Sequence, residues 1–374
     1  MTAAEISARL DRLRQKMSAV GLDAVMVGEK YNYWYLSGHQ TREIEKVMRP
    51  MLFIVPLSGD PVAVLYRQQG ATLQKTVPNA KLYGYEDVPF DTALLVEALA
   101  DAGLSGARLG LELGPNHRLG LPYSQLQAVR EALPGITIAD AGPLLDDLRL
   151  HKSPYEIAAL KAAADMSLGA WQRSVERFRV GMTEEEFARL VASELSAAGS
   201  QFDVAGHVST YTTAGARTAP IQLGDTIWCD FGGTLDGYQA DIARRAVIGL
   251  PRAEQLAEHE RVSTLFRAAL EAITPGARAS DVARACNAAM QKAGLTPITG
   301  RKRIGHGLGL NAGESPSLGL EDDTLLEPGV VVCVEPRYFL PSGEKVHIED
   351  VVVVTEQGFD YISRGCEQLV VIGA

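Results

Sequence analysis

Three strand-like segments in the second half of the 374-residue chain are too apolar to lie at a surface, yet each carries a carboxylate. They read Ile-Trp-Cys-Asp-Phe over residues 227–231, Val-Val-Val-Cys-Val-Glu over residues 330–335, and Val-His-Ile-Glu-Asp-Val-Val over residues 346–352. A buried, unpaired carboxylate costs several kcal/mol or takes up a proton. A fold that brings these acids to a shared cation would explain all three segments together.

The first of these segments leads through a glycine-rich turn to a second acid. Asp230 lies near the end of the predicted strand, Gly232 and Gly233 follow, and Asp241 comes eleven residues after Asp230. The two arms of one hairpin can aim both carboxylates into the same space. Like charges that close repel each other unless a cation lies between them.

Two histidines accompany the acids. His306 is flanked by glycines, which we expect to turn the backbone tightly and leave the imidazole accessible. His347 and Glu349 are two residues apart and share one face of a predicted strand over residues 345–354, because side chains alternate along a strand.

The simplest joint explanation is a pair of divalent metal ions, in which four carboxylates balance two dications. Oxygen-rich ligation with one imidazole favours manganese, cobalt, iron or zinc over a thiolate-type site. Two such ions ~3.5–4 Å apart can bridge a water molecule and lower its pKa toward neutrality. The expected metal ligands are Asp230, Asp241, His306, Glu335 and Glu349.

The first part of the chain has a different pattern of predicted helices and strands. Helix-like and strand-like segments alternate up to about residue 145, as in a small α/β domain, and a polar break with a proline follows at residues 150–154. Ser153 with Glu156, and Thr183 with Glu186, have capping-box spacing and predict two helix starts. Residues 181–199 also align without gaps on residues 276–294, which indicates a duplicated unit with a site at its centre.

Composition excludes several classes of protein. A net charge of −10 without a basic block argues against nucleic-acid binding. The four cysteines lack metal or disulfide spacing, so buried free thiols are expected. The first residues lack the apolar core of a signal peptide, and no apolar run reaches the ~18 residues of a membrane span. We therefore expect a cytoplasmic protein.

The order of these motifs resembles the pita-bread metallopeptidases, and in particular their Xaa-Pro aminopeptidase and prolidase branch, with creatinase as a relative. The order is Asp, eleven residues, Asp, then Gly-His-Gly, Val-Glu-Pro and Ile-Glu-Asp, and residues 150–157 resemble that branch's entry to its catalytic domain. The resemblance implies an N-terminal creatinase-like α/β domain over residues 1–148. A pita-bread α/β catalytic domain with pseudo-two-fold symmetry would then span residues 149–374, and a homodimer is expected.

The resemblance also implies roles for the five ligands. Asp230 would bind one metal, Asp241 and Glu349 would bridge both, and His306 and Glu335 would bind the second. Glu335 would also shuttle a proton while a bridging hydroxide attacks the amide bond of a short peptide or another small amide.

The chain departs from that family at three positions. A family histidine seventeen residues before the first aspartate is replaced by Thr213, and another, seven residues after the ligand histidine, by Gly313. An arginine common two residues before the last glutamate is replaced by His347. We expect His347 and His207 to supply catalytic groups in their place. Further candidates, for which a structural role is favoured, are Tyr211, Arg217 and Glu314.

The expected function is a dinuclear metal-dependent hydrolase of the Xaa-Pro aminopeptidase or prolidase type. The altered positions leave open a non-peptidase of the same fold, either a small-amide C–N hydrolase or a lyase of sulfonium compounds. A catalytically inactive binding module is the least favoured reading, because unused buried carboxylates would carry only a burial cost.

Overall fold

The structure is a computed structural model, and it describes residues 1–86, 90–201, 208–212 and 218–373. The chain divides into two compact units, Met1–Arg149 and Leu150–Ala374. Among the described residues, no helix combines the length and apolar character that a membrane crossing requires.

The first unit is an α/β domain built on one six-stranded sheet of order β4-β3-β2-β1-β5-β6. The predicted hairpin is confirmed, since β2 and β3 pair antiparallel, and β5 and β6 join the sheet in parallel. The strands are β1 (Ala24–Val27), β2 (Leu52–Pro56), β3 (Val62–Tyr66), β4 (Lys81–Tyr85), β5 (Arg108–Leu111) and β6 (Thr137–Asp140).

Apolar helix faces cover this sheet. The predicted first helix ends at Gly21, which adopts a left-handed conformation with φ 67° and closes the last turn. Short 3-10 turns lie at Arg42–Glu45 and Arg67–Gln69. The helices are α1 (Ala3–Val20), α2 (Lys30–Ser37), α3 (Gly70–Leu73), α4 (Thr92–Asp101), α5 (Tyr123–Ala132) and α6 (Gly142–Leu150).

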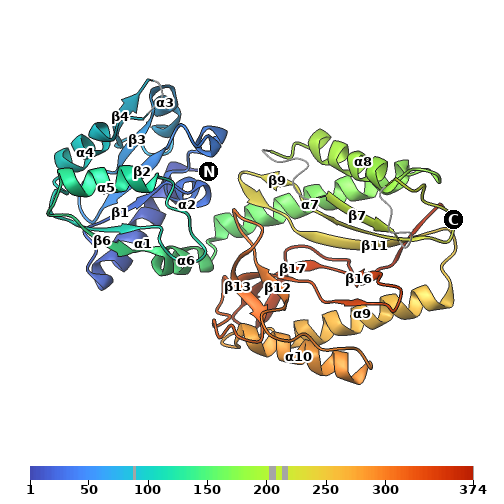
Figure 1. Cartoon of the computed structure of the whole chain (residues 1–374). Coiled ribbons are helices and arrows are strands. Elements are labelled where there is room, and N and C mark those ends of the chain that lie inside the picture. The colour runs from blue at the N-terminus through green and yellow to red at the C-terminus, as the bar shows by residue number, and fades with distance from the viewer. Residues whose placement is uncertain (87–89, 202–207, 213–217, 374) are drawn as a thin grey trace. The chain divides into compact units, whose positions relative to one another are not determined.

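The second unit holds two helix pairs and two larger sheets, and in Figure 1 the strands of this unit lie between the pair α7 and α8 and the pair α9 and α10. Both predicted capping boxes are present, at the starts of α7 and α8. The helices are α7 (Pro154–Arg177), α8 (Glu184–Ala197), α9 (Ala253–Glu271) and α10 (Ala279–Lys292).

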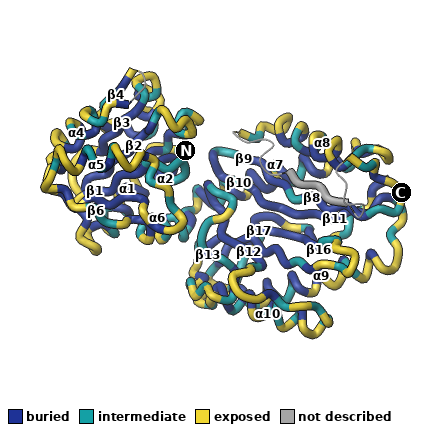
Figure 2. Tube along the Cα trace, viewed as in Figure 1, coloured by how far each residue is buried: buried dark blue, intermediate teal, exposed yellow. Residues whose placement is uncertain are grey.

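The strands of this unit form two sheets, of order β19-β11-β8-β7 and β13-β12-β14-β17-β18, and two short ribbons, β9 with β10 and β15 with β16. Figure 2 shows β8, β11, β12 and β17 as largely buried, with exposed residues concentrated on the helices and loops. The strands are β7 (Val208–Thr212), β8 (Thr226–Phe231), β9 (Thr234–Leu235), β10 (Tyr238–Gln239), β11 (Ile242–Ile248), β12 (Arg303–Gly307), β13 (Glu314–Gly319), β14 (Val331–Val334), β15 (Arg337–Phe339), β16 (Lys345–His347), β17 (Asp350–Thr355), β18 (Gly358–Tyr361) and β19 (Val370–Ile372).

The internal repeat predicted from the sequence has a structural counterpart. Helices α8 and α10 each have 14 residues and begin after the matching glycines Gly181 and Gly276, both of which have positive φ. The amide of each glycine donates to a carbonyl just ahead of an inner strand, that of Ile221 before β8 and that of Leu326 before β14. The duplication thereby gives β8 and β14 equivalent places: β8 carries Asp230, and Glu335 directly follows β14.

Candidate metal centre

Strands β8 and β11 bring the two predicted aspartates together. They pair antiparallel with Ala243 opposite Asp230, and Asp241 lies directly before β11. The predicted hairpin is thus confirmed. Its glycine is required because a Cβ at Gly232 would lie 1.7 Å from the Ala240 carbonyl oxygen.

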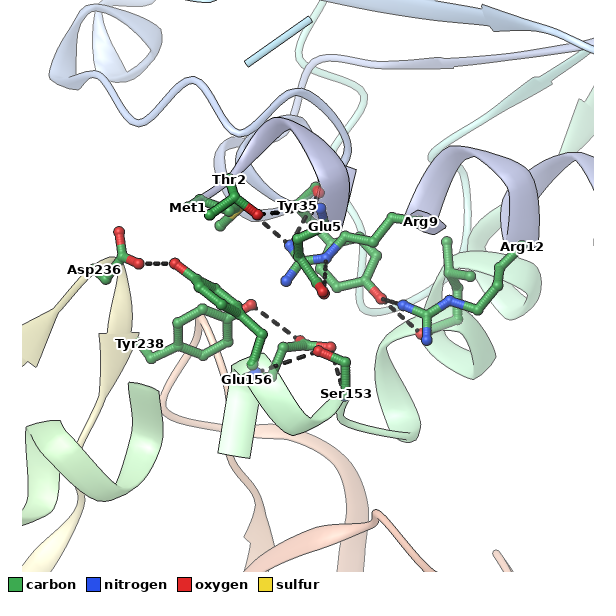
Figure 3. Close-up of polar contacts among 12 residues, drawn as sticks. Met1, Thr2, Glu5, Arg9, Arg12, Tyr35, Ser153, Glu156, Asp236 and Tyr238 are labelled. Carbon is green, nitrogen blue, oxygen red and sulfur yellow. Dashed lines mark hydrogen bonds and ion pairs between the residues drawn. The ribbon is translucent and has the colours of Figure 1, made fainter. Parts of the chain in front are cut away.

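A second contact fixes the approach to Asp241. Tyr238, on β10, donates its hydroxyl to Glu156 Oε1 at 3.0 Å, and the other oxygen of Glu156 accepts from the Ser153 amide at 3.0 Å (Figure 3). The capping box of α7 therefore also anchors the strand that leads to Asp241.

His306 lies inside strand β12, where it pairs with Cys333 of β14. The predicted tight, accessible turn is wrong, because the imidazole is buried within a sheet. The flanking glycines instead allow close packing of the backbone. A Cβ at Gly305 would lie 2.1 Å from the Cys333 carbonyl oxygen, and one at Gly307 would lie 2.1 Å from that of Ser315.

The two predicted glutamates come from the other inner strands. Glu335 follows β14, and its amide donates to the Ile304 carbonyl at 2.8 Å. Glu349 lies between β16 and β17, so the single strand predicted over residues 345–354 is wrong. The break arises because Glu349 pairs with Ala243, in an isolated bridge, instead of continuing the ladder.

A buried ion pair holds Glu349 in place. Arg244 Nη2 lies 2.7 Å from Asp350 Oδ1, and its Nη1 donates to the Glu349 carbonyl at 2.7 Å. Asp350 also accepts from the Ser363 hydroxyl and the Cys366 amide, both at 2.7 Å. Because every one of these groups is buried or nearly so, the backbone at Glu349 is tightly determined.

These elements bring all five predicted ligands to one buried cluster. His306 Nε2 lies 3.5 Å from Asp241 Oδ2 and 3.6 Å from Glu335 Oε1. Ligand atoms of Asp241, His306 and Glu349 lie within 4.8 Å of one another, as do those of Asp230 and Glu349 with His347.

The electrostatics of the cluster favour the binding of cations. Burial, followed by the charges of Asp241 and Glu335, holds the pKa of Glu349 well above its usual range. Burial also raises the pKa of Glu335, against the opposing charge of Arg337. Glu349 Oε1 is buried and has no hydrogen-bond partner among the described residues. Divalent cations would satisfy these carboxylates, so the residues present fit a metal pair.

His347 also faces this cluster, as predicted from its spacing to Glu349. Its Nε2 lies 3.7 Å from Glu349 Oε2 and 3.9 Å from both Asp230 Oδ2 and Glu335 Oε2. Burial, followed by the charge of Lys345, lowers the pKa of His347 to about 3, so the ring is neutral near pH 7.

Two residues of the cluster were not predicted. Cys333 contributes a thiol beside Asp241, His306 and Glu349, and burial holds the pKa of that thiol well above its usual range. Strand alternation could have found it, because it precedes Glu335 by two residues. Arg337 donates to Glu335 Oε2 at 2.5 Å, and nothing local in the sequence pointed to that contact. All four cysteines are buried free thiols, as expected.

Of the remaining candidates, the structure describes the side chain of Glu314 alone. His207, Thr213 and Arg217 lie outside the described residues, and only the backbone of Tyr211 is described. Glu314 forms a buried ion pair with Lys152, at 3.0 Å between Nζ and Oε2, which favours the structural role.

Comparison with known proteins adds independent evidence. Residues 158–356 match the Metallopeptidase family M24, and residues 9–151 match the Creatinase/Prolidase N-terminal domain. The chain is 28% identical to a putative dipeptidase, YkvY, of Bacillus subtilis, over 97% of this chain and 99% of that one. It is 25% identical to the Xaa-Pro dipeptidase of Pyrococcus furiosus, over 95% of this chain and 97% of that one.

Similarity to a solved structure extends over the whole chain. The crystal structure of dipeptidase PepE from Mycobacterium ulcerans superposes with a TM-score of 0.82 at 25% identity, covering 100% of this chain and 99% of that one. The predicted fold class is confirmed, with a creatinase-like N-terminal domain ahead of a pita-bread domain. The chain belongs to metallopeptidase family M24 and is a metallopeptidase-type hydrolase.

Proposed function

We propose that the chain is a dinuclear metal-dependent peptidase of the Xaa-Pro aminopeptidase or prolidase type, which cleaves an amide bond of a short peptide. The observation that carries the proposal is the convergence of four carboxylates and an imidazole, with Glu349 Oε1 buried and without a hydrogen-bond partner among the described residues. Xaa-Pro dipeptidase homologues make a proline substrate the first to test.

Each ligand would have a defined place. Asp230 would hold one ion, Asp241 and Glu349 would lie between the two ions, and His306 and Glu335 would hold the other. When bound, a pair of manganese, cobalt, iron or zinc ions lowers the pKa of a water molecule and polarises an amide carbonyl. The chain's own domains would be residues 1–148 and 149–374.

Glu335 is the proposed proton shuttle. One of its oxygens faces His306 and the other accepts from Arg337, so its carboxylate is held in one orientation at the cluster. Its oxygens can accept a proton from the attacking water and return it to the leaving amine, which is general acid–base catalysis. His347 and His207 are the proposed further catalytic groups, and a homodimer and a cytoplasmic location stay predictions.

The test begins with protein stripped by a chelator and reloaded with manganese, cobalt, iron or zinc. Each form is assayed on a panel of Xaa-Pro dipeptides and proline-second tripeptides, with Xaa-Ala peptides as matched controls. We expect metal-dependent turnover that prefers proline. Asp241→Asn should abolish it, whereas Glu356→Gln, at an exposed position between β17 and β18, should not change it.

Other outcomes separate the alternatives. A metal-replete protein that turns over no peptide would favour a small-amide C–N hydrolase or a lyase of sulfonium compounds. A protein that binds no divalent metal under any loading condition would favour the binding module and overturn the proposal.

A further inference from the structure

His347 is a buried imidazole whose Nε2 has no hydrogen-bond partner among the described residues. Leaving a buried polar group unsatisfied costs about 1–3 kcal/mol. Most buried polar atoms in proteins do have partners, and an exception of this kind often marks contact with a bound water or ion.

The surroundings of the ring indicate what that group is. Nε2 faces carboxylate oxygens of Glu349, Asp230 and Glu335 at 3.7 to 3.9 Å. These distances are too long for hydrogen bonds, which join such atoms at about 2.7–3.2 Å. Two ligands of one zinc ion, each bound at about 2.0–2.2 Å, lie roughly 3–4 Å apart, so the spacing suits a shared cation.

A comparison with His306 also supports a cation shared by His347 and the neighbouring carboxylates. His306 Nε2 lies 3.5 Å from Asp241 and 3.6 Å from Glu335, so the Nε2 atoms of both imidazoles lie at similar distances from neighbouring carboxylate oxygens. His306 belongs to one group of potential ligands, with Asp241 and Glu349, whereas His347 belongs to the other, with Asp230 and Glu349. The two imidazoles therefore serve opposite ends of the cluster.

Packing fixes the orientation of the His347 ring. The indole of Trp228 meets it edge to face, with ring centroids 5.3 Å apart and planes at 77°. The ammonium of Lys345 lies 4.1 Å above that indole, and Arg337 pairs with His347 across the β15–β16 ribbon. Arg337 donates to Glu335, and Nε2 of His347 faces the carboxylates.

We propose that His347 is a sixth protein ligand, which adds an imidazole to the ion held by Asp230, so that each ion of the pair has one imidazole. This proposal rests on the dinuclear site of the proposed function. It predicts a metal preference too, because imidazole suits zinc and iron whereas carboxylate-rich sites suit manganese. The site should therefore favour zinc or iron over manganese more strongly than it would with His306 alone.

The direct test is X-ray absorption spectroscopy of the full chain loaded with two equivalents of zinc, in which imidazole ligands have a distinct scattering signature. We expect an average of one imidazole for each zinc ion in the wild-type protein. His347→Asn should lower that average to one imidazole for every two zinc ions. His259→Asn is the matched control, because His259 is a buried histidine of the same unit that contacts the Glu367 carbonyl.

Metal titration by calorimetry gives a second readout. Losing a partner that only orients a ligand costs about 10–100-fold in metal affinity, so His347→Asn should weaken one of the two sites by at least tenfold. His306→Asn should weaken the other site instead.

The failure of this proposal is distinct from failure of the proposed function. Two bound zinc ions with one imidazole between them in the wild-type protein would overturn the His347 assignment and leave the dinuclear peptidase intact. That wild-type measurement needs no variant to fold. A wild-type protein that binds no zinc pair would overturn both.

Discussion

Replacement of Glu349 by glutamine should stabilise the metal-free protein while removing its capacity to be stabilised by metal. The side chain is 2% exposed, and its Oε1 has no hydrogen-bond partner among the described residues. A structural carboxylate would be satisfied by hydrogen bonds or an ion pair, and its loss would destabilise the fold. Loss of a carboxylate that serves metal binding should instead stabilise the fold when no metal is present.

The structure sets the size of the effect. An unsatisfied buried acceptor costs about 1–3 kcal/mol. A charge on Asp241, whose ligand atom lies within 4.8 Å of that of Glu349, adds repulsion of at least about 3.5 kcal/mol when both groups are ionised, at an effective dielectric constant near 20. Proton uptake by Glu349 relieves part of both costs. We therefore expect Glu349→Gln to raise the free energy of unfolding of the metal-free protein by about 1–3 kcal/mol at pH 8.

The pH dependence follows from the direction of the pKa shift. Burial and neighbouring acids raise the pKa of Glu349, so the folded chain keeps a proton that the unfolded chain releases near pH 4.3. The free energy of unfolding of the metal-free wild type therefore falls as pH rises above that value. The gain from Glu349→Gln should be small at pH 5 and larger at pH 8.

The assay is scanning calorimetry of chelator-treated protein at both pH values, with and without added zinc. For a unit of this size, each kcal/mol shifts Tm by about 2–4 °C. Glu314→Gln is the matched control, because it breaks the buried ion pair between Glu314 and Lys152 and should cost about 3–5 kcal/mol. If Glu349→Gln destabilises the metal-free protein as Glu314→Gln does, Glu349 is a structural acceptor and the reasoning is refuted.

Three further predictions concern other groups. Glu335→Gln should keep the fold and lower kcat by about 10²–10⁴-fold, the usual contribution of a positioned acid–base group, and near-normal turnover would rule out its shuttle role. Arg244→Met should lower the free energy of unfolding in urea by about 3–5 kcal/mol. The double variant with Asp350→Asn should lose less stability than the sum of the two single losses, whereas simple additivity would show that the pair is not coupled. Burial raises the pKa of Glu112, in the first unit, to about 7, so the unfolding free energy of that unit should fall by about 3 kcal/mol in total between pH 4.5 and 7. Hydrogen exchange of the amides in β1 and β5 measures this dependence on pH, which should be absent in Glu112→Gln. An unchanged dependence in that variant would contradict the assignment.

Features with local causes were predictable from the sequence. The capping boxes at Ser153 and Thr183 predicted the starts of α7 and α8, because a cap depends on residues within one helical turn. Strand alternation placed His347 and Glu349 on one side, although the strand itself is broken between them. Helix α9 was not predicted, and its N-cap, Arg252, is not one of the residue types that favour this position.

Features set by distant segments were not predictable in the same way. The glycines beside His306 looked like a turn, whereas the backbone of Cys333 and Ser315 presses against them within a sheet. The break at Glu349 depends on a bridge to Ala243, more than one hundred residues earlier in the chain. The contact between Arg337 and Glu335 likewise depends on the ribbon formed by β15 and β16.

The central claim is that five side chains hold two divalent ions, and anomalous diffraction from crystals of the metal-loaded protein tests it most directly. We predict two anomalous peaks inside the cluster formed by Asp230, Asp241, His306, Glu335 and Glu349. Peaks elsewhere on the chain, or none at this cluster in crystals grown with excess metal, would contradict the account.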